Sequence, residues 1–201
     1  MDDKRNRILE LVSFIQSLGI EVNIGKNKAR GNKGFFRAKE GSFRIDIAKN
    51  QKEEEILHLL VHEFAHYLHY TNDKTLKSLD FIFNENDDLQ EEMIELTVNL
   101  IPKSSIEPLF RAKDELTEEI KSGTNVELQR KALRRVNAKI ARLNRYYNMP
   151  TELFARTLET YFTANDKCKV IAPIVTQQIE STLANNKFPV LNTLNNILNN
   201  G

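Results

Sequence analysis

The chain has 201 residues and a mass of 23.3 kDa, the size of one ordinary domain. With 40% hydrophobic and 28% charged residues, its composition is neither that of a disordered chain nor that of a membrane-embedded one. Twenty-nine Lys and Arg against 28 Asp and Glu leave a formal charge of +1, which excludes a strong overall field for nucleic acids or anionic membranes. The single cysteine, Cys168, excludes an internal disulfide, and no apolar stretch of a secretory signal opens the chain. We therefore expect a cytoplasmic protein without a membrane partner.

The predicted elements begin with a helix and a small sheet. Residues 4–18 carry a stripe of apolar side chains at helical spacing. Between 20 and 48, three short β-favouring runs are separated by turns rich in Gly, Asn and Lys, which predicts a small antiparallel sheet. The last run, SFRIDIA at 42–48, alternates apolar and polar residues. We expect this strand beside the next helix, where its edge could bind an extended peptide.

The rest of the chain has the helical period. It predicts a helix over 52–71, a helical hairpin over 105–148 and a helix over 150–164. The second arm of the hairpin has an apolar seam spaced three or four residues apart, made by Leu133, Val136, Ile140, Leu143 and Tyr147. The predicted fold is α+β and mainly α, with one domain over 1–201 that contains the hairpin as an insert.

All four histidines lie in the helix predicted over 52–71, at His58, His62, His66 and His69. His62 and His66 are four residues apart, so both imidazoles lie on one helical face and can bind one metal ion. Glu63 is rotated by roughly 100° from His62 and can reach a water beside that ion as a general base. This HExxH pattern, His62-Glu-Phe-Ala-His66, suits zinc, which accepts two imidazoles and keeps a position for water. The pattern predicts a metal-dependent hydrolase.

A third protein ligand is needed, and two later segments can supply a carboxylate. His69 lies too far along the same helix from His62 to meet the same ion. The segment MPTELFARTLETYF offers Glu152, with Glu159 seven residues later on the same face. The segment LQEEMIELTVNLIP offers three carboxylates, those of Glu91, Glu92 and Glu95.

HEFAHYLHY and PTELFARTLETYF together resemble the gluzincin-type metalloproteases of phage and mobile-element polyvalent proteins. They are also similar to the catalytic domain of anthrax lethal factor. The resemblance implies a zincin-like peptidase fold, with zinc bound by His62, His66 and Glu152 and with Glu63 as the catalytic residue. It implies a protein or peptide substrate.

Two alternatives stay open. EEMIELTVNLIP is similar in outline to the ligand helix of ImmA/IrrE-type regulatory peptidases, which would place the third ligand at Glu91, Glu92 or Glu95. The second alternative is a non-catalytic module in which the metal is structural or lost and the hairpin binds a partner.

Two further groups of side chains have ordinary explanations. The segment 128–147 carries seven Lys and Arg and no acid, which suggests a nucleic-acid surface, but we favour the solvated face of a hairpin whose acids lie nearby at 113–119. Tyr146, Tyr147 and Tyr161 lie near the ligand helix in sequence, and one phenol could stabilise an oxyanion. Most helical tyrosines are packing residues.

Overall fold

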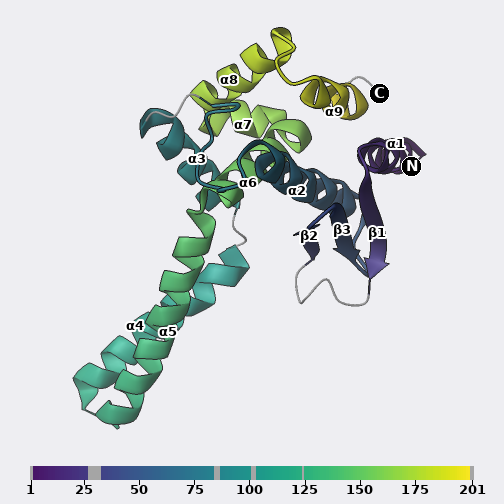
Figure 1. Cartoon of the computed structure of the whole chain (residues 1–201). Helices are drawn as coiled ribbons and strands as arrows, with labels where there is room; N and C mark the ends of the chain where they lie inside the picture. Colours follow the sequence, from purple (N-terminus) through teal and green to yellow (C-terminus); the bar gives the residue numbers. More distant parts are fainter. Residues whose placement is uncertain (1, 27–32, 84–86, 101–102, 124, 200–201) are drawn as a thin grey trace. The chain divides into compact units, whose positions relative to one another are not determined.

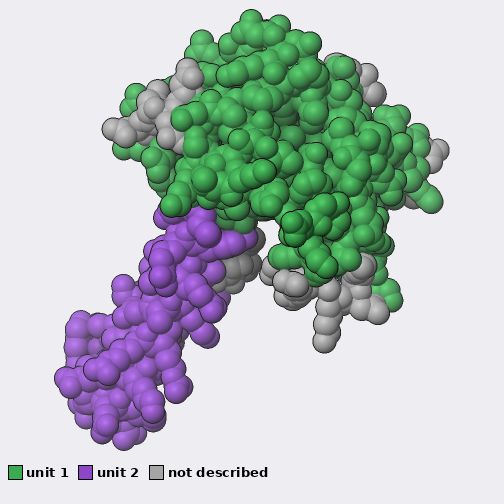
Figure 2. Space-filling view, viewed as in Figure 1, with its two compact units in different colours: residues 1–96, 150–201 green, residues 97–149 purple. Residues whose placement is uncertain are grey.

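The computed structural model describes residues 2–26, 33–83, 87–100, 103–123 and 125–199. The chain divides into two compact units, drawn in green and purple in Figure 2. The first unit comprises residues 1–96 and 150–201, and the second comprises residues 97–149, which include the hairpin expected as an insert.

The described part of the chain is mainly helical with one three-stranded sheet (Figure 1). Every helix in the described ranges is too short or too polar to cross a lipid bilayer. The elements are α1 (Asp2–Ser17), β1 (Ile20–Lys26), β2 (Gly34–Lys39), β3 (Ser42–Ala48), α2 (Glu53–Asn72), α3 (Asp87–Leu100), α4 (Lys103–Ser122), α5 (Val126–Tyr147), α6 (Pro150–Thr163), α7 (Asn165–Ile171), α8 (Pro173–Ala184) and α9 (Pro189–Asn199).

The sheet is mixed, so the prediction of an antiparallel sheet was wrong for one of its strands. The strand order is β1-β3-β2, with β2 antiparallel and β1 parallel to β3. β2 and β3 form a hairpin whose turn contains Gly41 at φ +74°, a conformation that glycine adopts without a Cβ clash. The sequence of the longer connection from β1 to β2 does not specify which edge of the β2–β3 hairpin β1 joins. In the structure, β1 pairs with β3 on the side away from β2.

This order also corrects the prediction for SFRIDIA. The segment is β3, the central strand, and it is paired on both edges, so it cannot accept a further strand. Its two isoleucines, Ile45 and Ile47, are fully buried and contribute to the core under α2. The edge strand beside α2 is β2 instead.

Helix α2 is the central element of the first unit, in contact with β2 and β3 and with α6 (Figure 1). Three glutamates at 53–55 lie in its first turn, where their negative charges interact favourably with the positive end of the helix dipole. Glu55 also accepts a hydrogen bond from the backbone N–H of Lys52. Leu60, Phe64 and Leu68 of α2 are buried, and Phe64 contacts Phe14 of α1 edge to face with ring centroids 5.8 Å apart. Leu153, Phe154 and Leu158 of α6 are buried as well. Polar residues between these apolar ones are therefore held in a rigid, dry setting.

The second unit contains the hairpin of α4 and α5. The five seam residues of α5, from Leu133 to Tyr147, are half-buried, and α5 has no fully buried residue in its described range. The seam of α4 consists of Leu109, Ala112, Leu116 and Ile120, also half-buried.

Candidate metal centre

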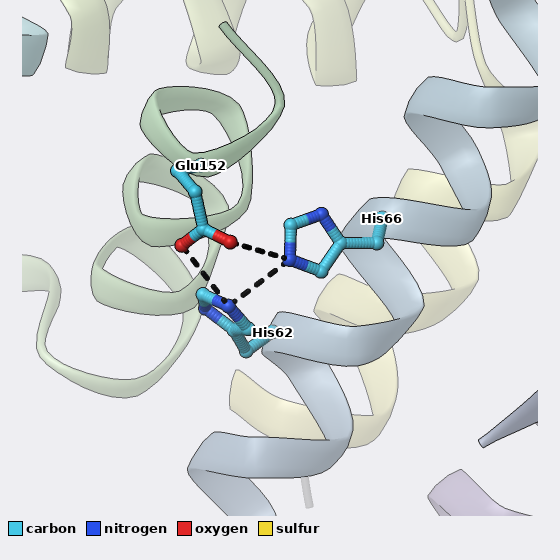
Figure 3. Close-up of side chains that lie close together, drawn as sticks. All are labelled: His62, His66 and Glu152. Carbon is cyan, nitrogen blue, oxygen red and sulfur yellow. Dashed lines mark hydrogen bonds and ion pairs between the residues drawn. The ribbon is translucent and has the colours of Figure 1, made fainter. Parts of the chain in front are cut away.

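His62 and His66 lie one turn apart on the face of α2 that packs against α6. Helical spacing predicts this common face, and the structure adds that both side chains are largely enclosed, with His62 only 8% exposed. The two rings are nearly perpendicular, at 87°, with centroids 4.8 Å apart. Their Nε2 atoms point towards each other across 3.2 Å (Figure 3).

Glu152, in the first turn of α6, brings a carboxylate to these two nitrogens. Its Oε1 lies 3.3 Å from Nε2 of His66, and its Oε2 lies 3.8 Å from Nε2 of His62 (Figure 3). The carboxylate is 4% exposed. These three residues form a buried group that could hold a metal ion, with their ligand atoms within 4.8 Å of one another.

The donor set fits a tetrahedral ion. With metal–ligand bonds of about 2.0 to 2.1 Å, two tetrahedral ligand atoms are about 3.3 Å apart. The His62–His66 and His66–Glu152 separations of 3.2 and 3.3 Å match this spacing, and the His62–Glu152 separation of 3.8 Å is somewhat longer. Two imidazoles and one carboxylate are also a protein ligand set that leaves a position for water.

Two partners from α6 fix the histidine rings in the orientation that ligation needs. Nδ1 of His62 lies 3.0 Å from Oε2 of Glu159, and a carboxylate can only accept, so this nitrogen carries the hydrogen. Nδ1 of His66 lies 2.9 Å from the hydroxyl of Thr151, which can accept in the same way. Each neutral ring then presents an Nε2 lone pair to the centre, which is the tautomer that binds a metal.

The pKa values reflect this network. Burial acts to lower the pKa of His62, but the hydrogen bond with Glu159 and the surrounding carboxylates raise it overall. Burial acts to raise the pKa of Glu159, but the hydrogen bonds from His58 and His62 lower it to about 2. Glu159 is therefore an anion in the folded protein at neutral pH, positioned to orient His62.

Glu63 faces the sheet beside the His62–His66–Glu152 group. It is 6% exposed, and its carboxylate accepts a hydrogen bond from the backbone N–H of Phe36 in β2. Gly34 also contacts it so closely that an added Cβ would lie 2.7 Å from Oε1. Burial raises the pKa of Glu63 above its ordinary value, while His62 and His66 act in the opposite direction. A carboxylate with a raised pKa is a stronger proton acceptor.

The other candidate ligands lie elsewhere. Glu92 in α3 accepts hydrogen bonds from the backbone N–H groups of Ile174 and Val175, at 3.2 and 2.9 Å, and so caps the N-terminus of α8. Glu91 and Glu95 are exposed, and none of the three belongs to the His62–His66–Glu152 group.

The two flanking histidines have other contacts. His58 Nδ1 lies 3.3 Å from Glu159 and 3.0 Å from the Thr163 hydroxyl. His69 is fully buried, with Nε2 3.0 Å from the carbonyl oxygen of Ser78. Neither histidine is part of the group that could hold a metal.

The three tyrosines have different surroundings. Tyr161 is 5% exposed, and Glu180 and Cys168 lie near its phenol. Burial raises its pKa to about 12, which favours a packing role on the side of α6 away from Glu152. Tyr146 and Tyr147 belong to the second unit. Cys168 is buried, and burial raises its pKa.

Three contacts of the site were not predicted. Thr151 contacts His66, and both Gly34 and Phe36 contact Glu63. Each contact joins segments far apart in the chain, and no spacing rule in the sequence predicts it.

No protein-family profile, curated protein or solved structure matches this chain.

Proposed function

We propose that this protein is a zinc-dependent metallopeptidase, with His62, His66 and Glu152 as the metal ligands and Glu63 as the general base. The observation that carries the proposal is the enclosed His-His-Glu group, whose two imidazoles are each fixed from behind by a side chain of α6. A chance cluster of polar residues has no reason to leave both Nε2 lone pairs facing one point. The resemblance of HEFAH and ELFARTLETYF to gluzincin motifs agrees with this assignment.

The chain's own residues supply the proton transfers. Zinc in this site would polarise the carbonyl of a bound peptide and lower the pKa of a water molecule towards about 7. Glu63 accepts a proton from this water as the water oxygen attacks the carbonyl carbon. Glu63 then donates that proton to the amide nitrogen as the C–N bond breaks, so that a carboxylic acid and an amine leave.

The free edge of β2 is the proposed binding site for the peptide. The N–H of Phe36 points to Glu63, and so away from β3. Because alternate residues of a strand direct their backbone groups the same way, those of Gly34 and Ala38 also face the free edge. A peptide that adds to β2 as a further strand would pass beside Glu63 and the metal ligands.

The proposal is tested by metal analysis and peptide cleavage on the same preparations. Zinc-reconstituted protein should contain about one zinc per chain and cleave members of a peptide library, detected by mass spectrometry. Glu63→Gln should keep its zinc and lose hydrolysis by about 10²- to 10⁴-fold. The control is Glu180→Gln, which changes an exposed carboxylate on α8 and should alter neither property.

Two results would contradict these roles. If Glu63→Gln lost zinc as completely as His66→Ala, Glu63 would be a ligand and not a base. Zinc binding without cleavage of any library peptide would support the non-catalytic metal-binding module instead.

A further inference from the structure

The formal charge of +1 conceals an uneven distribution between the two units. Residues 97–149 contain eleven Lys and Arg against six Asp and Glu, a net charge of +5. The first unit contains eighteen against twenty-two, a net charge of −4. A charge asymmetry of this kind within one chain indicates a surface for a charged partner.

Most of the positive charge of the second unit lies along one side of α5. Seven of its side chains are cationic and all seven are exposed: Arg130, Lys131, Arg134, Arg135, Lys139, Arg142 and Arg145. At 100° per residue they occupy about half of the helix circumference, opposite the half-buried seam. From Arg130 to Arg145 they extend over roughly 22 Å. We call these seven residues the basic ridge.

The basic ridge outnumbers the acids beside it, because Glu127 is the one acid within the described range of α5 and the other nearby acids belong to α4. The acids of α4 that we expected to balance it, at 114, 115, 118 and 119, are exposed, and helical spacing places Asp114 and Glu118 opposite the seam of α4. Glu118 pairs with Lys121 of its own helix, and Glu119 accepts a hydrogen bond from Gln129. Within the described ranges, no ion pair joins a residue of the basic ridge to an acid.

We infer that the basic ridge binds the phosphate backbone of a nucleic-acid duplex. An α-helix is about 10 to 12 Å wide and enters a DNA major groove about 12 Å across. Cations over half the circumference can then meet phosphates on both sides of the groove. Two exposed alanines, Ala138 and Ala141, lie among the cations and allow close approach of the helix.

This inference is independent of the proposed peptidase activity. The basic ridge lies in the second unit, whereas His62, Glu63, His66 and Glu152 all lie in the first.

Arginine forms bidentate hydrogen bonds with phosphate, and five of the seven cations are arginines. Contacts to phosphate carry little sequence information, so we expect binding without strong sequence preference.

The test is binding of the full chain to labelled DNA duplexes of about 20 base pairs by fluorescence anisotropy. Affinity should fall with salt, with a slope of log K against log salt of about −4 to −6 for four to seven phosphate contacts. Two duplexes of unrelated sequence should bind within a factor of about two of each other. Changing Arg134, Arg135 and Arg142 together to Gln should weaken binding about tenfold or more and reduce the slope by about 3.

Two variants control for net charge and folding. The same three positions changed to Lys should retain most of the affinity, since the positive charges remain. Changing Lys39, Lys49 and Lys74 to Gln alters the net charge equally on exposed positions of the first unit and should have little effect. All variants should keep the circular dichroism of the parent, because Gln and Lys are good helix formers in α5 and the three first-unit positions are exposed.

Three outcomes would overturn the inference. The first is no binding of either duplex at about 50 mM salt. The second is an equal loss of affinity in the α5 and first-unit variants. The third is binding to phosphatidylserine vesicles, lost in the α5 Gln variant, without any binding to DNA, which would identify a membrane surface instead.

Discussion

Glu159 of α6 accepts a hydrogen bond from Nδ1 of His62 in α2, at 3.0 Å. The two residues are 97 positions apart in the chain, and their contact sets the tautomer of the histidine. Its other oxygen lies 3.3 Å from His58, so one carboxylate anchors two residues of α2. The pairing couples the packing of α2 on α6 to the geometry of the candidate metal centre.

Loss of this carboxylate should weaken metal binding without abolishing it. We expect Glu159→Ala to lower zinc affinity by about 10- to 100-fold, as is typical when a partner of a ligand histidine is removed. Glu159→Gln keeps an acceptor oxygen and should have a smaller effect. Competition titration with a chromophoric chelator measures both. An affinity equal to that of the parent in Glu159→Ala would show that His62 is oriented without it.

The identity of the third ligand can be decided by comparing two helices. Glu152→Ala leaves two histidines as protein ligands and should weaken zinc binding more strongly than Glu159→Ala. Changing Glu91, Glu92 and Glu95 together to Ala should preserve the affinity of the folded protein. That triple variant should instead lose about 1 to 2 kcal/mol of stability in denaturant unfolding, because Glu92 caps α8. The opposite pattern of affinities would favour the ImmA/IrrE-like interpretation.

Gly34→Ala should impair hydrolysis while leaving the metal in place. The added Cβ would lie 2.7 Å from Oε1 of Glu63 and 3.1 Å from its Cγ, so this buried carboxylate has to move. We expect kcat to fall by about tenfold or more, since small misplacements of a catalytic group are costly, with zinc content unchanged. Gly41→Ala is the matched control, because its Cβ would meet nothing within 4 Å although its φ is +74°. It should reduce stability and leave kcat of the zinc-loaded protein intact.

Asp73 should make stability depend on pH in the acidic range. Its carboxylate accepts four hydrogen bonds from residues 75–78, and those from Thr75 and Ser78 hold its pKa well below the ordinary value. The unfolded chain takes up a proton near pH 4 and the folded chain does not, so this stabilisation is complete at neutral pH and decreases as the pH falls below about 4. Asp73→Asn should therefore destabilise the protein more at pH 7 than at pH 3 in urea unfolding. An equal destabilisation at both pH values would show that the charge contributes nothing.

The features that depend on local spacing could be predicted from the sequence. The period of 3.6 residues places His62 and His66 on one face of α2, and the seven-residue interval places Glu152 and Glu159 on one face of α6. It also identified the seam of α5 from Leu133 to Tyr147. Each of these features depends on the geometry of one helix. Short-range backbone hydrogen bonds set that geometry independently of the rest of the chain.

The contacts between distant segments could not be predicted, because they depend on how the elements pack together. The sequence offered the carboxylates of α3 and α6 as third ligands, and the packing of α6 on α2 brings Glu152 to the histidines while Glu92 caps α8. In the same way, the place of β1 beside β3 leaves the edge of β2 next to Glu63. These choices depend on which apolar faces pack against each other. Hydrophobic burial is non-directional, so the spacing of apolar residues within one element does not specify the element it packs against.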